Sequence, residues 1–338
     1  MGERTRPFRV LAIDGGGIRG IVPALILAEV ERRAGAPIAS LFDLVVGTST
    51  GGILAVALTI ADAQGRPRFG PLDLVGLYES EASRIFWPWG SSAGWLHALF
   101  HPKYRGSGIE AVLQERFGVE TRLSASVGPE VAVTSFELDA RQLYVFRSWD
   151  ARRSPSRDFP VWQVARASSA APTYFPAAQA TSVDGSSILH CVDGGVCVDA
   201  PVVLALAEAR TLLAGQGDRG GDVFLLSVGT GTPPESAVPY ERVKDGGVLT
   251  WLEHGLLDII LDGVNDAANQ EAAAILPQGS YVRLQPPLNG PGYSAGPAMD
   301  DCSAANLAQL RRAAEVFIEV EGSALAAVAA RLAGVRPA

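Results

Sequence analysis

Apolar residues are arranged along this chain in two kinds of pattern. Short unbroken apolar runs that end in glycine or polar residues are typical of buried strands, whereas apolar residues three or four apart favour helices. In the first part of the chain the two patterns alternate, which predicts strands over residues 8–13 and 41–47 and helices over residues 19–34 and 50–63. Two successive units of strand, turn and helix indicate a parallel α/β sheet.

The same patterns continue towards the C-terminus. They predict a strand pair within residues 130–149, a helix over 161–172, a strand over 222–231, a helix over 249–276, a strand over 281–285 and a final helix over 303–332. We therefore expect an α/β fold in which a parallel-rich central sheet is sandwiched by helices.

The sequence has no internal repeat and no long low-complexity linker that would divide it into parts. We expect a single domain over residues 8–320, with a motif-bearing core of about 11–206, followed by a helix end and tail over 321–338. The 338 residues are 48% hydrophobic, which is enough to form one large core.

Charge and cysteine content limit the classes of partner. The net charge of −8 argues against binding to a nucleic-acid duplex, because such proteins need a basic face. The three cysteines, Cys191, Cys197 and Cys302, are too few and odd in number for a disulfide framework, which agrees with a reducing compartment. The four histidines show no metal-ligand spacing, so we expect no metal.

Two features of the sequence bear on location. The first eight residues contain no apolar segment of the kind that a secretion signal requires. The longest apolar runs are about half of the roughly 20 residues that a membrane span needs. We expect a cytoplasmic protein that can still make peripheral contact with a membrane.

A glycine-rich loop follows the first predicted strand. Gly15, Gly17 and Gly20 give the spacing G-x-G-x-x-G, which is also found in dinucleotide-binding turns. Such folds place an acidic residue at the end of the second strand to bind the ribose. Here the acid, Asp43, lies at the start of the second predicted strand, so we expect no nucleotide cofactor.

The end of the second predicted strand carries a motif for nucleophilic catalysis. Residues Gly47 to Gly51 read GTSTG, which is G-x-S-x-G between an apolar strand and a helix. This context is typical of a nucleophile elbow, in which flanking glycines allow a strained turn to expose the serine. We therefore predict that Ser49 is a nucleophile, at the N-terminus of the helix that follows.

A serine that attacks an acyl group needs hydrogen-bond donors where the carbonyl oxygen becomes negative. Backbone amides of a glycine loop at a helix start supply them without reorganisation. Gly15, Gly16 and Gly17 offer consecutive amides, and Arg19 adds positive charge nearby. We predict that this loop forms an oxyanion hole.

The serine also needs a base. In α/β-hydrolases the base is a histidine that follows an acid in the chain, but His190 lies in an apolar run and His254 within a helical pattern. Asp193 ends a short apolar run, and Gly194 and Gly195 follow it. A buried carboxylate there can accept the proton directly; the alternative is an ordinary turn residue before two glycines.

The stretches DGGGIRG, GTSTG and DGG, in this order, resemble those of the patatin-like phospholipases. That resemblance implies a patatin-like fold with a Ser-Asp dyad and no catalytic histidine. It makes Ser49 the nucleophile and Asp193 the base, with the oxyanion hole at Gly15, Gly16 and Gly17 and support from Arg19, Gly47, Gly51, Gly194 and Gly195. Asp199 departs from the family pattern, which often has Asn there.

The resemblance further implies a serine carboxylic-ester hydrolase that acts on phospholipids or other acyl lipids, as a phospholipase A or a lysophospholipase. Three alternatives stay open. The first is an acyltransferase that uses the same acyl-enzyme, and the second is a phospholipase effector of antiphage defence that a cyclic nucleotide activates. The third is a lipid-binding module without catalysis.

Two further segments suggest partners. Trp87, Trp89 and Trp95 lie close together, which favours either contact with a lipid surface or a folded aromatic cluster over the sheet. Residues 150–158 are basic, which fits either a solvated loop or a site for a small anionic activator.

Overall fold

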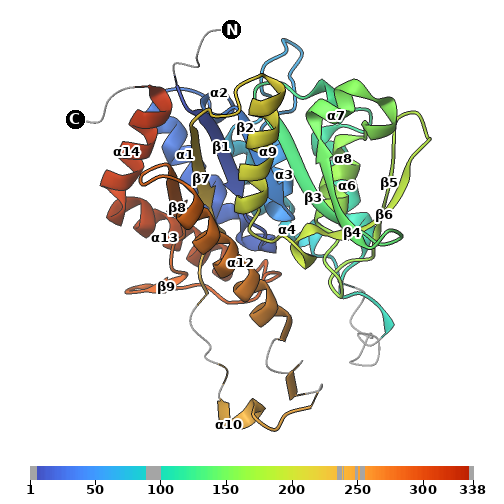
Figure 1. The fold of residues 1–338 in the computed structure, drawn as a ribbon. Helices are drawn as coiled ribbons and strands as arrows, with labels where there is room; N and C mark the ends of the chain where they lie inside the picture. The colour runs from blue at the N-terminus through green and yellow to red at the C-terminus, as the bar shows by residue number, and fades with distance from the viewer. Residues whose placement is uncertain are drawn as a thin grey trace.

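The structure, a computed structural model, describes residues 6–88, 100–233, 238, 240–247, 250–251 and 256–334. Its centre is an eight-stranded sheet in the order β5-β6-β3-β2-β1-β7-β8, with β4 also paired to β3 (Figure 1). The strands are β1 Phe8–Ile13, β2 Leu44–Thr48, β3 Glu130–Glu137, β4 Gln142–Arg147, β5 Ala178–Thr181, β6 Ile188–Asp193, β7 Val223–Val228 and β8 Tyr281–Leu284.

Most of the sheet is parallel. β1 pairs in parallel with β2 and β7, β2 with β3, and β7 with β8, whereas β4, β5 and β6 join antiparallel. Every residue of β1 and of β7 is buried, as expected for strands covered by helices on both faces. The predicted α/β fold with a parallel-rich, helix-flanked sheet is confirmed.

Helices pack on both faces of the sheet (Figure 1). The α-helices are α1 Ile21–Ala34, α2 Ile38–Leu41, α3 Thr50–Ala57, α4 Pro71–Ile85, α6 Gly106–Phe117, α7 Ser148–Arg153, α8 Val161–Ser168, α9 Val202–Gly215, α10 Tyr240–Val243, α12 Leu256–Ile275, α13 Ala304–Val320 and α14 Gly322–Ala333. Short 3-10 turns are η1 Gly17–Gly20, η2 Leu123–Ala125, η3 Pro155–Arg157 and η4 Gly194–Val196, and a small hairpin pairs β9 Asn289–Gly290 with β10 Tyr293–Ser294.

Alternate residues of β1 enter two different cores. Leu11 and Ile13 pack with α1, α3, α4, α6, α8, α13 and α14, whereas Val10 and Ala12 pack with α9 and the end of α12. The alternation follows from the period of two in a strand, and it gives three layers of helix, sheet and helix. Among the described residues, no helix combines the length and the hydrophobicity needed to cross a bilayer.

Several predicted boundaries differ from the structure. The first helix starts at Ile21 because residues 17–20 form a 3-10 turn, and the second helix ends at Ala57 instead of residue 63. The final helix is in fact two, because the chain turns at Glu321 and α14 then packs against α1. Leu325 and Val328 of α14 are buried in the same core as α1, while the predicted division at residue 320 stays a prediction.

The sheet brings the motif-bearing segments together at one edge. Ile13, the last residue of β1, lies opposite Gly47 near the end of β2, so both following loops leave the same edge. β6 runs antiparallel to β3 and places Asp193 opposite Ser135, while the neighbouring Thr134 lies opposite Thr48. Residues far apart in the chain therefore meet beside Ser49.

Candidate active site

Ser49 lies in a strained turn between β2 and α3. Its backbone has φ 55° and ψ −121°, a conformation that costs a non-glycine residue about 1–3 kcal/mol. A Cβ at Gly47 would lie 2.1 Å from the carbonyl oxygen of Gly51, and one at Gly51 would lie 2.2 Å from that of Ile13. Only glycines fit at these positions, so the motif permits the turn that exposes the serine. The Ser49 amide donates to Ser168 Oγ at 2.8 Å.

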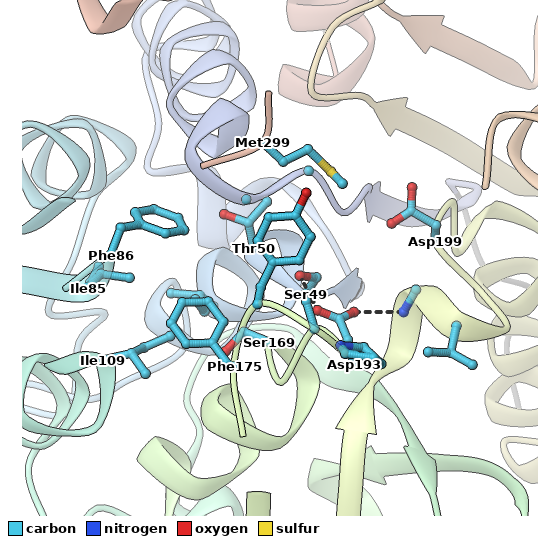
Figure 2. Close-up of a pocket in the computed structure, with 18 of the residues that line it drawn as sticks. Ser49, Thr50, Ile85, Phe86, Ile109, Ser169, Phe175, Asp193, Asp199 and Met299 are labelled. Carbon is cyan, nitrogen blue, oxygen red and sulfur yellow. Dashed lines mark hydrogen bonds between the residues drawn. The ribbon is translucent and has the colours of Figure 1, made fainter. Parts of the chain in front are cut away.

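The Ser49 hydroxyl donates to Asp193. Ser49 Oγ lies 2.7 Å from Asp193 Oδ2, and the other carboxylate oxygen, Oδ1, accepts from the Gly195 amide at 2.7 Å (Figure 2). The neighbouring Gly194 allows the close turn, since a Cβ there would lie 2.2 Å from Thr134 Oγ1. The structure thus brings together the two residues that the sequence suggested as nucleophile and base.

Asp193 is a carboxyl group without a close cation. Its side chain is 5% exposed, and burial raises its pKa to about 7, against the lowering effect of the hydrogen bonds from Ser49 and Gly195. Within the described part of the chain no ion pair includes Asp193; Arg166, whose charge acts on it, instead bonds to Glu110 and to the Pro176 carbonyl. A carboxyl in this state can accept a proton near neutral pH.

The glycine loop offers fewer free amides than the sequence suggested. The Gly15 amide donates to the Asp199 carbonyl at 3.1 Å, so it is already engaged, and the Ile18 amide donates to the Met299 carbonyl at 2.8 Å. Gly16 and Gly17 line the same cavity as Ser49, and the hydrogen bonds of the described residues include none from either amide. Two of the three glycines predicted for the oxyanion hole thus line the serine's cavity.

Arg19 lies within η1, next to this loop. Its Nε donates to the Gly16 carbonyl at 3.4 Å, a long hydrogen bond that helps to hold the loop. The contact places a guanidinium at the start of α1, as the sequence suggested.

An apolar cavity of about 140 Å³ opens onto Ser49. In Figure 2, Phe86 and Phe175 lie on one side of the serine and Asp199 on the other. Thr50 and Tyr78 join their hydroxyls by a hydrogen bond, which satisfies polar groups in an apolar wall. The apolar lining residues are Ile53, Leu77, Ile85, Phe86, Ile109, Leu113, Ala171, Pro172, Phe175, Val196, Leu261 and Met299.

A second buried carboxylate follows β1. Asp14 is 3% exposed, and its Oδ2 forms an ion pair with Arg283 Nη2 of β8 at 2.5 Å. Burial raises the pKa of Asp14, and the charge and hydrogen bond of Arg283 work against that rise. Arg283 Nη1 also donates to Ser227 Oγ at 2.7 Å, whereas Asp14 Oδ1 has no hydrogen-bond partner among the described residues.

Other residues that the sequence singled out lie elsewhere. His190 is half exposed, and its Nδ1 bonds to Asp139 at 2.8 Å on the far side of β6 from the serine. Cys191 is fully buried in the core, as a small hydrophobe. Trp87 is 55% exposed, whereas Trp89, Trp95 and His254 lie outside the described residues.

The basic segment 150–158 makes contacts within the protein. Arg152 pairs with Glu130, and Arg157 Nη1 donates to the Tyr144 hydroxyl at 3.2 Å. The solvated loop suggested by the sequence was wrong, because residues 150–153 belong to α7 and 155–157 to η3. The anionic activator stays a prediction.

Several residues that shape the site had no signal in the sequence. Ser168 holds the Ser49 amide, Met299 covers the glycine loop and Asn265 binds the Asp199 carboxylate. Each comes from a segment distant in the chain, so that only the folded structure reveals its role. The pattern of glycines and one acid was the part that the sequence could show.

The sequence comparisons identify one family. The family model described as "Patatin-like phospholipase" matches residues 11–206. "Patatin-like protein 2" of Oryza sativa subsp. indica is 29% identical over 350 residues, covering 94% of this chain and 85% of that protein. "Patatin-T5" of Solanum tuberosum is 32% identical over 341 residues, covering 92% of this chain and 83% of that protein. Among solved structures, human GIVD cytosolic phospholipase A2 matches with a TM-score of 0.46 and 12% identity, over 97% of this chain and 60% of that one.

Proposed function

Because this chain belongs to the patatin-like phospholipase family, we propose that it is a serine hydrolase of acyl lipids in which Ser49 is the nucleophile and Asp193 the general base. The observation that carries the proposal is the 2.7 Å hydrogen bond from Ser49 Oγ to the buried Asp193, at the wall of an apolar cavity. The family supports lipid hydrolysis in general, and the dyad gives that activity a mechanism.

In the first half of the reaction, Ser49 Oγ attacks the ester carbonyl carbon while its proton moves to Asp193 Oδ2. The carbonyl oxygen becomes negative and accepts hydrogen bonds from the Gly16 and Gly17 amides. The intermediate then collapses: the bond to the alcohol oxygen breaks, and that oxygen takes the proton from Asp193. The acyl group remains as an ester of Ser49.

The second half releases the fatty acid. A water molecule gives its proton to Asp193 and attacks the acyl-enzyme carbonyl, and the same two amides bind the oxyanion again. Ser49 leaves with the proton from Asp193, which restores the free enzyme. Asp193 suits both halves because its pKa of about 7 lies near a neutral operating pH.

The lining of the cavity supports a lipid substrate. Its walls are mostly aliphatic and aromatic, so an acyl chain gains free energy by leaving water there. We assign phospholipase A or lysophospholipase activity to this protein, with the substrate's ester at Ser49 and its head group towards solvent.

Exposed apolar residues near the cavity support contact with a lipid surface. On α12, Leu261 lines the cavity while the neighbouring Ile260 is 50% exposed. Trp87, which directly follows the cavity-lining Phe86, is 55% exposed. We therefore propose peripheral membrane contact through Trp87, since tryptophan favours the boundary between lipid and water.

A fluorophosphonate probe and a phospholipid panel test this function together. The wild-type protein should be labelled at Ser49 and should release free fatty acid from a phospholipid, as identified by mass spectrometry. Ser49→Ala should lose labelling and turnover, whereas Ser169→Ala, which removes another hydroxyl from the cavity wall, should still be labelled. Labelling of Ser49→Ala would place the nucleophile elsewhere, and transfer to an added alcohol in place of fatty acid release would indicate an acyltransferase.

A further inference from the structure

Asp199 places a second carboxylate in the wall of the cavity. Its Oδ2 accepts from Asn265 Nδ2 of α12 at 2.7 Å, and Asn265 Oδ1 accepts from the Ala200 amide at 2.8 Å. One asparagine therefore holds both the side chain of Asp199 and the backbone that follows it. Because the planar amide of Asn265 donates to the carboxylate and accepts from the next backbone amide, it fixes the direction of the carboxylate.

The same residue also holds the glycine loop. The Asp199 carbonyl accepts from the Gly15 amide at 3.1 Å, directly before the two glycines that line the cavity. A Cβ at Gly15 would lie 2.0 Å from Asp199 Oδ1, and one at Gly195 would lie 3.0 Å from it. The carboxylate thus occupies the space that two glycines leave between the loop and the turn that carries Asp193.

Asp199 Oδ1 makes no hydrogen bond to a described residue. No hydrogen-bond donor of the described chain therefore offsets the charge on this oxygen. The charged groups whose fields reach Asp199 come from the loop after β1 and from η1, β6, β8 and α12; they are Asp14, Arg19, Asp193, Arg283 and Asp262.

We propose that Asp199 is a positioning residue: its carbonyl fixes the oxyanion loop, and its carboxylate, held by Asn265, keeps a second negative charge beside Asp193. The catalytic part of this inference rests on the proposed function, whereas the electrostatic part does not. A negative neighbour disfavours ionisation of Asp193 and makes its carboxylate a better proton acceptor.

The titration of both carboxyls agrees with this arrangement. Burial raises the pKa of Asp199 to about 6, and Asp14 adds to the rise while Asn265 and Arg19 work against it. The charge of Asp199 in turn contributes to the raised pKa of Asp193. Loss of the Asp199 charge is therefore expected to lower the pKa of Asp193.

The test measures the Asp193 pKa directly, by carbon-13 NMR of protein labelled at its aspartate carboxyls, with the resonance assigned by its loss in Asp193→Asn. In Asp199→Asn, whose Oδ1 can still accept from Asn265, the Asp193 pKa should fall by about 0.5 unit or more. An unchanged value in the folded variant overturns the electrostatic role. If Asp199→Asn does not fold, Asp199→Ser gives the same measurement.

Kinetics test the positioning role. Asn265→Ala should lower kcat about tenfold to 10²-fold with KM nearly unchanged, because the loop and carboxylate lose their shared anchor. Asn269→Ala is the matched control, since Asn269 lies one turn further on α12 and bonds to the Asn265 carbonyl and Tyr281. Equal kcat in the two variants overturns positioning by Asn265. A shifted Asp193 pKa in a protein without ester turnover would instead refute the proposed function alone.

Discussion

Two carboxylates in this protein are equally buried but have opposite surroundings. Asp14, after β1, faces the guanidinium of Arg283, whereas Asp193, at the end of β6, faces a serine hydroxyl and a backbone amide. Both lie at the edge of the sheet where the glycine loop and the elbow meet. The difference between them is the formal charge of the partner.

This difference decides what each carboxylate can do. A buried charge is costly, and the ion pair with Arg283 offsets part of the cost for Asp14, whose pKa burial still raises. The neutral donors to Asp193 offset only part of the cost of burying its charge, so its pKa is raised to about 7. A carboxyl group that an arginine holds in an ion pair and one that only neutral donors contact therefore share one edge of the sheet.

The largest effect should come from removing the basic oxygen of Asp193. In Asp193→Asn the amide oxygen can accept from Gly195 while the amide nitrogen donates to Ser49, so the fold persists but no base remains. We expect kcat to fall about 10²-fold to 10⁴-fold. In the wild type, kcat should decline as pH falls below about 7, where Asp193 takes up a proton. Near wild-type turnover by Asp193→Asn would remove it as the base.

Removing the ion-pair partner of Asp14 should lower the stability of the protein. Arg283→Met leaves Asp14 buried without a cation, which should cost about 3–5 kcal/mol of unfolding free energy. Chemical denaturation at pH 8 measures the loss. The double variant Asp14→Asn/Arg283→Met should recover much of it, because no buried charge remains; no recovery would mean that Arg283 acts through packing alone.

The raised pKa of Asp193 predicts how the free energy of unfolding changes with pH. A native pKa of about 7, above the reference value of 3.8, means that the folded state holds the proton more tightly than the unfolded state. Stability from the neutral form is complete below about pH 4 and lost as pH rises to about 7, by about 4 kcal/mol at most.

The Asp193→Asn variant does not ionise at this position, so its stability does not change in this way between pH 4 and pH 7. Its melting temperature relative to the wild type should therefore rise between pH 4 and pH 7 and then level off. Scanning calorimetry across this range measures the difference, and a constant difference would mean that Asp193 is not neutral in the fold at low pH.

The smallest effect is expected at a histidine. His190→Gln should keep activity within about tenfold, or about 1.4 kcal/mol, because His190 bonds to Asp139 and not to Ser49. Initial rates on the same phospholipid, with circular dichroism as the folding control, measure it. A loss as large as that of Asp193→Asn would restore a histidine triad.

The sequence could predict the strands and helices that carry the first two motifs because their signals are local. β1 and β2 are continuous apolar runs, and glycines mark each turn that follows. The break at Glu321 was missed because apolar periodicity continues across it, and only the packing of α14 on α1 reveals the change of direction.

The site was predictable where chemistry depends on residue type and turn geometry. Ser49 and Asp193 were named from glycines beside them, but the loss of the Gly15 amide to the Asp199 carbonyl was not foreseeable. The hydrogen bond from Asn265 to Asp199 could not be predicted from the sequence either. Such contacts join segments that the fold brings together, and no local pattern encodes them.

The antiparallel pairing of β6 with β3 affects the order in which the site forms during synthesis and folding. Ser49 is synthesised early and its turn can form with β1 and β2, but Asp193 reaches it only when β6 has paired with Ser135, Phe136 and Glu137. Such non-local pairing is slow compared with the formation of local structure. During synthesis the turn that carries Ser49 can therefore form before Asp193 reaches it, and the hydrogen bond between the two residues appears only when β6 has joined the sheet.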